Sequence, residues 1–375
     1  RSSDLLIFLV KIKFIMKVCI IGNNLTSLAL AKALINKEIF VDIFYKNKKI
    51  NIDKTRTIGI SQSNIDYFNK NLSNINKILW PIKKIKIYSE NSGNEDIIRF
   101  EDEEKSLFSI VKNDKITNQL CLELKKSRFF KFKKDIGYKS LSKGDYDLLI
   151  NCDLKHEITK KFFHKKFEKE YSSIAFTTVI YHKKLKLNNT ATQVFTDNGP
   201  IAFLPISNEK TSIVYSIRTK NFDTEINIGS VIKKFNLDYQ IKNIGKISKF
   251  KLSSLNLRHY YKNNILAFGD LLHKLHPLAG QGFNMSIRDI SILVEIINEK
   301  IELGLSLDES VCVEFQNRTK SSNFIFSEGV DFIYESFNSN DKFKKNFIDR
   351  SVKLIGKNKL MNKYFKKIAD TGLNL

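Results

Sequence analysis

The residues best suited to chemistry lie in one run, GDLLHKLHPLAGQGFN, at positions 269–284. It places the acid Asp270 near its start and the closely spaced Gly280 and Gly282 near its end. The apolar run at 264–268 predicts a buried strand before it, and apolar residues at three- and four-residue steps predict a helix after it. The carboxylate can accept hydrogen bonds from a chain of hydroxyls. The N–H groups and dipole at the helix start favour an electron-rich ligand.

Elements near the start of the chain must support this run. Positions 18–21 predict a buried parallel strand that ends at Gly22, 25–35 predict a helix, and 40–44 predict a second strand. This strand–helix–strand order is typical of a Rossmann-like dinucleotide-binding domain.

The phosphate-binding fingerprint GxGxxG is incomplete at this point. Its three positions hold Gly22, Asn24 and Ser27, so one glycine of the three is present. Tyr45 stands where an acid is expected to hold a ribose, and Asp42 lies within the strand and should point elsewhere. The fingerprint alone is therefore weak support for a dinucleotide site.

The middle of the chain changes character. Alternating β-rich runs at 174–182, 192–196, 201–206 and 211–218 predict an antiparallel sheet. After position 303 the chain reads as helical and basic.

The amino-acid composition limits the kinds of binding partner and cofactor that the protein is expected to have. The net charge is +23, with 63 Lys and Arg against 40 Asp and Glu, but lysine pairs are scattered and no nucleic-acid-binding signature occurs. A basic surface would still favour docking on an anionic membrane. The four cysteines are far apart and the six histidines lack a completed ligand set, so free thiols, a reducing cytoplasm and no metal site are expected.

Residues 1–15 precede Met16 and the first predicted strand. We expect them to be an upstream extension of the reading frame. A short membrane anchor is the alternative, but lysines interrupt the run and a span needs about 20 apolar residues.

The run at 269–284 resembles the second flavin-binding motif of the class A FAD-dependent aromatic hydroxylases, in the branch that hydroxylates ubiquinone precursors. That pattern reads Gly-(Asp/Asn)-x-x-His-x-x-His-Pro-x-Ala-Gly-Gln-Gly-x-Asn, with Arg-Asp a few residues on. The matching residues in this chain are His273, His276, Pro277, Ala279, Gly280, Gln281, Gly282, Asn284, Arg288 and Asp289.

Further segments carry the same resemblance. Positions 56–61 look like the family segment after the second strand, and 80–87 look like its first substrate-domain strands. Positions 146–153 resemble the third motif, in which Asp-Gly follows a strand, but Leu154 replaces that glycine and cannot readily adopt a positive φ. Positions 193–205 resemble the strands that roof the flavin, and 315–337 the C-terminal helices.

The resemblance implies an α/β fold, in which a Rossmann-like FAD-binding domain is interleaved with a mainly antiparallel β substrate domain. We expect the FAD-binding domain at 16–75, 105–160 and 250–305, and the substrate domain at 76–104 and 161–249. The C-terminal helical region then covers 306–375, whose lysine-rich tail is either a solvated cap or an amphipathic surface element.

The implied activity is hydroxylation of the ring of a prenylated phenol in ubiquinone biosynthesis, using NADH or NADPH, O2 and a flavin C4a-hydroperoxide. Catalytic roles are expected at His276, Pro277 and Gly280; His276 is either an acid–base group or a structural hydrogen-bonding residue. Substrate contacts are expected at Phe195, Phe203 and Pro205; for Phe195 and Phe203, plain sheet core is the alternative. FAD contacts are expected at Gly22, Asn24, Leu25, Arg56, Asp153, Gly269, Asp270, Pro277, Gly280, Gln281, Gly282, Phe283 and Asn284.

Two other functions stay open. The chain could be a related flavoprotein acting on a soluble phenol or an isoprenoid, or a scaffold subunit of a quinone-biosynthesis complex that has lost flavin. Other quinone-biosynthesis proteins are expected partners and nucleic acid is not. The expected location is the cytoplasm, with peripheral contact on the inner face of the cell membrane.

Overall fold

The computed structural model describes residues 16–46, 52–90, 95–135, 137–138, 141, 145–219, 221–222, 226–275, 280–337, 367–368 and 370–372. The expected extension at 1–15 lies outside these residues, as do His276 and Pro277.

A six-stranded sheet forms the nucleotide-binding part, in the order β16-β17-β9-β1-β2-β8. All neighbours are parallel except the short edge pair β16 and β17. The predicted strand–helix–strand start is confirmed, because helix α1 (Leu25–Ile35) connects β1 to β2. The strands are β1 (Lys17–Ile21), β2 (Phe40–Tyr45), β8 (Phe130–Lys134), β9 (Leu148–Asn151), β16 (Tyr261–Lys262) and β17 (Ile265–Ala267).

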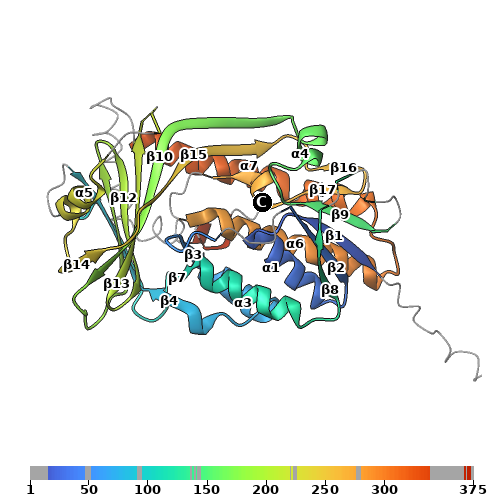
Figure 1. Cartoon of the computed structure of the whole chain (residues 1–375), viewed down its shortest axis with the longest axis horizontal. Helices are drawn as coiled ribbons and strands as arrows, with labels where there is room; N and C mark the ends of the chain where they lie inside the picture. The colour runs from blue at the N-terminus through green and yellow to red at the C-terminus, as the bar shows by residue number, and fades with distance from the viewer. Residues whose placement is uncertain are drawn as a thin grey trace, which may run out of the picture.

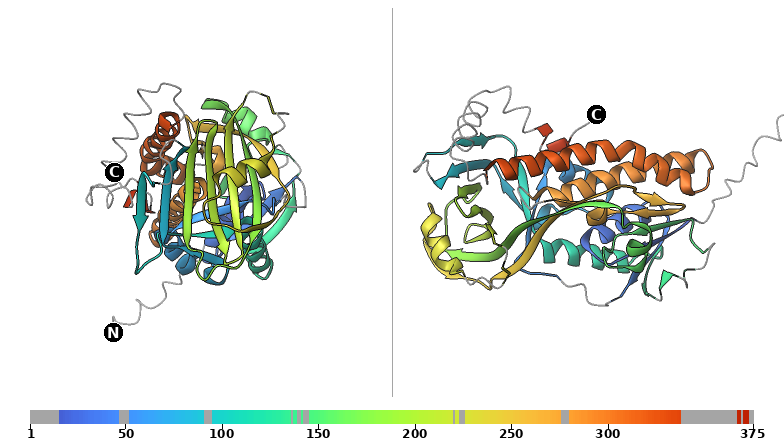
Figure 2. Two further views of the ribbon diagram at one scale, coloured as in Figure 1. Left: turned by 90° about the vertical axis from the view of Figure 1, so that its left-hand side faces the viewer. Right: turned by 90° about the horizontal axis from the view of Figure 1, so that it is seen from above.

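Helices pack against this sheet and against each other (Figure 1). Helix α1 contacts α3 (Asn113–Lys125) and α6 (Gln281–Glu302), and α6 lies beside α7 (Glu309–Phe337), as Figure 2 shows from above. One large core joins apolar side chains from these strands and helices. None of the described helices is both long and apolar enough to cross a membrane.

The predicted antiparallel sheet is confirmed at the opposite end of the molecule (Figure 1). Its order is β18-β15-β10-β13-β12-β11-β5-β6, and β14 also pairs with β10. Helix α5 (Ile228–Phe235) packs on one of its faces through Ile228 and Ile232. The strands are β5 (Lys84–Ser89), β6 (Ile98–Glu101), β10 (Lys166–His182), β11 (Thr190–Thr196), β12 (Gly199–Ser207), β13 (Lys210–Arg218), β14 (Ile241–Ile244), β15 (Ser248–Leu257) and β18 (His273–Lys274).

Strand β10 starts eight residues before the predicted start at position 174. Its first half, Lys166–Glu170, is exposed and pairs with the second half of β15, and Ser172 has a φ of 46° at the shift in register that follows. Four of its five residues are charged, so hydrophobic periodicity gave no signal. The two long strands run from the antiparallel sheet toward the parallel one (Figure 1).

A third, three-stranded sheet in the order β3-β7-β4 lies between these parts. The segment at 80–82 therefore joins this small sheet, whereas the next strand, β5, joins the large one as expected. The remaining elements are β3 (Thr57–Ser61), α2 (Gln62–Asn71), η1 (Asn76–Ile78), β4 (Leu79–Ile82), β7 (Phe108–Lys112), α4 (Glu157–Phe162) and η4 (Gly269–Leu271).

Candidate functional site

Two of the predicted cofactor residues meet where the parallel sheet changes winding direction. Strand β1 lies between β2 and β9, so the chain continues first to one side of it and later to the other. Ligands of doubly wound sheets bind in the crevice at such a point, beyond the carboxyl ends of the strands. Gly22 ends β1 with a φ of +97°, and a Cβ placed on it would lie 3.2 Å from the Cβ of Asp153 after β9. This crossing therefore requires glycine.

The Gly269-Asp270 pair reaches the same edge. A Cβ on Gly269, whose φ is +66°, would lie 2.9 Å from Cγ2 of Thr26 in the first turn of α1. Asp270 is exposed. Burial raises the pKa of the Cys152 thiol to about 12, and the nearby Asp270 and Asp153 carboxylates add to the rise. The two carboxylates thus share one neighbourhood, from which Asp270 can reach a ligand.

Asn24 replaces the second fingerprint glycine and caps α1 itself. Its Oδ1 accepts hydrogen bonds from the Ser27 N–H at 3.0 Å and the Ser27 hydroxyl at 3.1 Å. Its Nδ2 donates to the Cys152 carbonyl at 2.9 Å. The side chain fastens the β1–α1 turn to β9, and one N–H of the helix start is already occupied. Leu25 opens the helix as expected.

The backbone at Leu154 and the side chain of Asp42 both have the conformations that the sequence predicted. Leu154 is not among the non-glycine residues with positive φ, so the backbone after Asp153 differs from the Asp-Gly pattern. Asp42 points away from the crevice: its Oδ2 accepts from the Tyr146 hydroxyl at 2.7 Å and pairs with the Lys133 ammonium at 2.8 Å.

The start of α6 offers the bare peptide surface that a flat ring needs. Gly280 precedes the helix with a φ of 63°, and no side chain caps the helix start. A Cβ on Gly280 would lie 3.3 Å from the Gly59 nitrogen, whereas a Cβ on Gly282 would meet nothing within 4 Å. Among the described residues, nothing fills the space over Gly282 at this positive helix end, and the residues present fit a flavin ring.

The side chains of Phe283 and Asn284 are used in packing. Phe283 lies against Phe68 of α2, with ring centroids 6.5 Å apart. Asn284 is 2% exposed, and its Oδ1 accepts from the Ser61 N–H at 3.0 Å while its Nδ2 donates to the Gly59 carbonyl at 2.9 Å. At Asn284 only the backbone is left for a cofactor. Gln281 begins the helix and is half-buried.

A buried polar cluster supports the same helix. His273 on β18 and Asp289 on α6 are each 1% exposed, and their Nε2 and Oδ2 atoms lie 2.5 Å apart. Asn323 of α7 donates to the other Asp289 oxygen at 3.0 Å. Burial lowers the pKa of Arg288, whose guanidinium lies over the Phe326 ring. His273, Arg288 and Asp289 all match the family pattern, but their spacing in the sequence did not predict that they would form this buried cluster.

The remaining predicted site residues lie just before β3 and on the antiparallel sheet. Arg56 is exposed before β3, and its role stays a prediction. Phe195 and Phe203 belong to different cores on opposite faces of the antiparallel sheet. Phe203 is 2% exposed in the core beneath α5. Pro205 is two residues further along β12 and therefore lies on the same face of the sheet. Alternation along β12 turns Phe203 to the α5 face, away from Phe195. The substrate roles of Phe195, Phe203 and Pro205 stay predictions.

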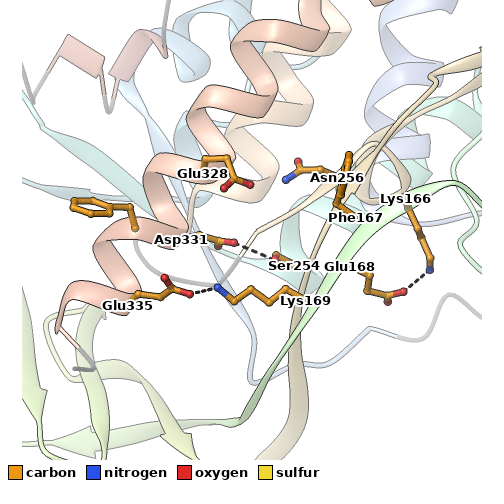
Figure 3. Close-up of a pocket in the computed structure, with 10 residues that line it drawn as sticks. Lys166, Phe167, Glu168, Lys169, Ser254, Asn256, Glu328, Asp331 and Glu335 are labelled. Atoms are coloured by element: carbon orange, nitrogen blue, oxygen red, sulfur yellow. Dashed lines mark hydrogen bonds and ion pairs between the residues drawn. The ribbon is translucent and has the colours of Figure 1, made fainter. Parts of the chain in front are cut away.

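A separate cavity of about 520 Å³ lies between β10, β15 and α7 (Figure 3). Asp331 on α7 points toward Ser254, which donates to it at 3.1 Å, and Lys169 pairs with Glu335 at the rim. The predicted catalytic, cofactor and substrate residues that the structure describes do not line this cavity.

Comparisons with known proteins agree with the geometry at the sheet edge. Residues 196–302 match the family described as the FAD binding domain. This match and the curated relatives support the resemblance to the FAD-dependent hydroxylases of ubiquinone biosynthesis. The chain is 28% identical over 162 residues to 3-demethoxyubiquinol 3-hydroxylase of Escherichia coli, a match that spans 40% of each chain. It is 22% identical over 413 residues to the mitochondrial ubiquinone biosynthesis monooxygenase COQ6 of Dictyostelium discoideum, covering 87% of this chain and 82% of that protein.

The fold has solved counterparts. Klebsiella pneumoniae HpxO, complexed with FAD and uric acid, aligns with a TM-score of 0.74 at 13% identity, covering 96% of this chain and 98% of that one. The predicted family and fold class are thus confirmed.

Proposed function

We propose that this protein is an FAD-dependent monooxygenase that hydroxylates the aromatic ring of a prenylated phenol, with NADH or NADPH as electron donor. One observation carries the proposal: four groups from distant parts of the sequence meet at one edge of the parallel sheet. They are Gly22, Asp153, the Gly269-Asp270 pair and the start of α6, which has no side-chain cap among the described residues. The strand order of the sheet and the packing of α1 on α6 bring them together. The relatives named for ubiquinone hydroxylation support the substrate class.

Each residue has a physical task in binding the cofactor. Gly22 and the start of α1 would meet the diphosphate of FAD, and Asp270 would accept hydrogen bonds from its ribityl hydroxyls. The peptide groups at Gly280 to Phe283 would lie against the ring and stabilise negative charge on its pyrimidine edge. Arg56 would add a positive charge beside the cofactor.

The bound cofactor would supply the oxygen chemistry, which side chains cannot perform. In the overall reaction the ring C–H becomes C–OH, NAD(P)H is oxidised, one oxygen atom of O2 enters the ring and the other leaves as water. The protein must orient the phenol and exclude bulk water. Pro277 and His276, for which an acid–base role or a structural hydrogen bond is predicted, lie outside the described residues, and their roles stay predictions. Phe195 stays the predicted substrate contact on the face away from α5.

The proposed substrate also indicates where in the cell the protein acts and with which partners. A prenylated phenol is stored in lipid, so we propose peripheral contact with the inner face of the cell membrane, supported by the net charge of +23. Other quinone-biosynthesis proteins are the proposed partners.

The test is turnover with isotopically labelled O2. The purified protein, supplied with FAD and NADPH, should add one labelled oxygen to a short-chain prenylated phenol in detergent micelles. At limiting FAD, Asp270→Ala should lower the rate at least about tenfold, because a hydrogen bond to a charged group contributes about 1.5–3 kcal/mol. Glu302→Ala, an exposed carboxylate at the far end of α6, should not change the rate.

Other results would favour the rival functions. Turnover of a soluble phenol but not the prenylated one would contradict the substrate class. A folded protein that takes up no FAD would favour the scaffold, which the self-capped Asn24 turn supports.

A further inference from the structure

The C-terminal end of the described chain packs directly on the helix that carries the flavin motif. Ile368 packs against the small core formed by Leu275, Met285 and Phe326. Gly372 has a φ of +78°, and a Cβ there would lie 3.0 Å from the Arg288 guanidinium carbon. The last residues therefore lie in close contact with α6.

Asp370 caps α2, a helix near the opposite end of the sequence. Its Oδ1 accepts a hydrogen bond from the Ser63 N–H at 2.9 Å, and its carbonyl accepts from the hydroxyls of Ser61 at 2.9 Å and Ser63 at 2.8 Å. The N-cap residue of α2, Ser61, makes no capping bond with its own side chain. A carboxylate at a helix start satisfies an unpaired N–H and interacts favourably with the helix dipole.

Buried hydrogen bonds continue from this cap to the flavin motif. The Ser61 hydroxyl accepts from Asn64 Nδ2 at 2.9 Å, and the same amide donates to Asn284 Oδ1 at 3.0 Å. Asn284 also holds the Ser61 N–H and the Gly59 carbonyl. Gly59 in turn lies against Gly280, the residue before α6. Ser61, Asn64 and Asn284 are at most 4% exposed, so water cannot easily replace these bonds.

We propose that Asp370 is a positioning residue for the cofactor. It fixes Ser61, and through Ser61 and Asn284 it holds the start of α6 in the orientation that receives the flavin ring. The FAD part of this inference rests on the proposed function. The predicted effect of Asp370 on the Ser61 amide is independent of the proposed function.

The experiment compares three variants of the full chain by FAD titration and by site-resolved amide exchange without FAD. Asp370→Ala removes the carboxylate that accepts from the Ser63 N–H but leaves the Asp370 backbone carbonyl. Asp370→Asn keeps a neutral acceptor oxygen, and Thr371→Ala removes a hydroxyl whose hydrogen bonds in the described chain stay within the C-terminal segment. We expect Asp370→Ala to raise the dissociation constant of FAD about tenfold, with Asp370→Asn within about twofold of wild type and Thr371→Ala unchanged. The Ser61 amide, which bonds to Asn284 and not to Asp370, should exchange faster in Asp370→Ala alone.

Two results would overturn the proposal. One is an Asp370→Ala protein whose FAD affinity and Ser61 exchange equal those of wild type. The other is equal loss in all three variants, which would indicate general fraying of the C-terminus. If wild type takes up no FAD, the proposed function fails, while the Ser61 exchange rates still decide whether Asp370 controls the α6 start.

Discussion

Individual residues at the sheet edge are constrained by backbone conformation and contact rather than by side-chain chemistry. Gly22 and Gly269 both have positive φ and both touch another segment, Asp153 in one case and Thr26 in the other. Gly304 has nearly the same φ as Gly269, +69° against +66°, but a Cβ there would meet nothing within 4 Å. Comparing Gly269 with Gly304 therefore separates the free-energy cost of backbone strain from the cost of close packing.

Gly269→Ala should therefore destabilise the protein more than Gly304→Ala does. Both variants carry the left-handed backbone cost of about 1–2 kcal/mol, and Gly269→Ala adds overpacking of about 1–3 kcal/mol against Thr26. Urea unfolding measures both free energies. Adding Thr26→Ser, which removes the clashing methyl group, should recover part of the loss at Gly269. Equal destabilisation of the two alanine variants would show that the close contact does not matter.

Much of the site's composition could be predicted from the sequence, because the glycines, Asp270 and Asp153 follow predicted strands or precede a predicted helix. The partners of these residues could not. That Asn24 would bond to the Cys152 carbonyl after β9, and that Asn284 would bond to β3, depends on which segments the tertiary fold brings together. Spacing along the chain carries no such information.

At the scale of elements, α6 and α7 are joined by contacts of two kinds. Inside, Asp289 is shared by His273 and Asn323. Outside, Arg318 of α7 bonds to Glu295 and Glu299 of α6 near the surface. Buried and exposed pairs on the same two helices should differ greatly in their effect on stability.

Asp289→Ala should lower the free energy of unfolding by about 3–5 kcal/mol, because it leaves buried donors on His273 and Asn323 without their acceptor. Glu295→Ala, on the same helix but with a side chain 61% exposed, should cost less than about 1 kcal/mol. Chemical unfolding with both variants checks the difference. Similar small losses would mean that the buried cluster does not hold α6 in place.

Element prediction succeeded where apolar periodicity was strong and failed where charge replaced it. Helix α1 has the predicted bounds, and α6 follows the predicted apolar spacing. The first half of β10 was missed because four of its five residues are charged and its order depends on pairing with β15. Pairing between distant strands cannot be read from either strand alone.

The whole molecule is held together by β10 and β15, which extend from the antiparallel sheet toward the nucleotide-binding part (Figure 1). The proposed domain boundaries at 161 and 250 fall near the starts of these strands, and the end of β15 already contributes Leu255 and Leu257 to the large core. Each part thus depends on strands that also belong to the other. The boundaries themselves stay a prediction.

We expect the two parts to unfold together. Trp80, the single tryptophan, lies in the small sheet and donates to the Asn188 carbonyl at 2.6 Å, so its fluorescence reports on the substrate side. Far-ultraviolet circular dichroism reports on all helices and strands. The two urea transitions should coincide, as cooperative unfolding requires. An earlier fluorescence transition would instead indicate a substrate domain that unfolds by itself.

The central claim, that a flavin ring rests on bare peptide at the start of α6, is tested most directly by filling that space. Gly282→Leu adds a side chain where no atom of the described residues lies within 4 Å of the added Cβ. Gly329→Leu on α7 makes the same change away from the motif, again with no described atom within 4 Å. Both variants should fold like wild type. In an FAD titration followed by flavin fluorescence, Gly282→Leu should bind at least about 100-fold more weakly, a loss of about 2.7 kcal/mol, whereas Gly329→Leu should match wild type. Unchanged FAD affinity in Gly282→Leu would contradict the account.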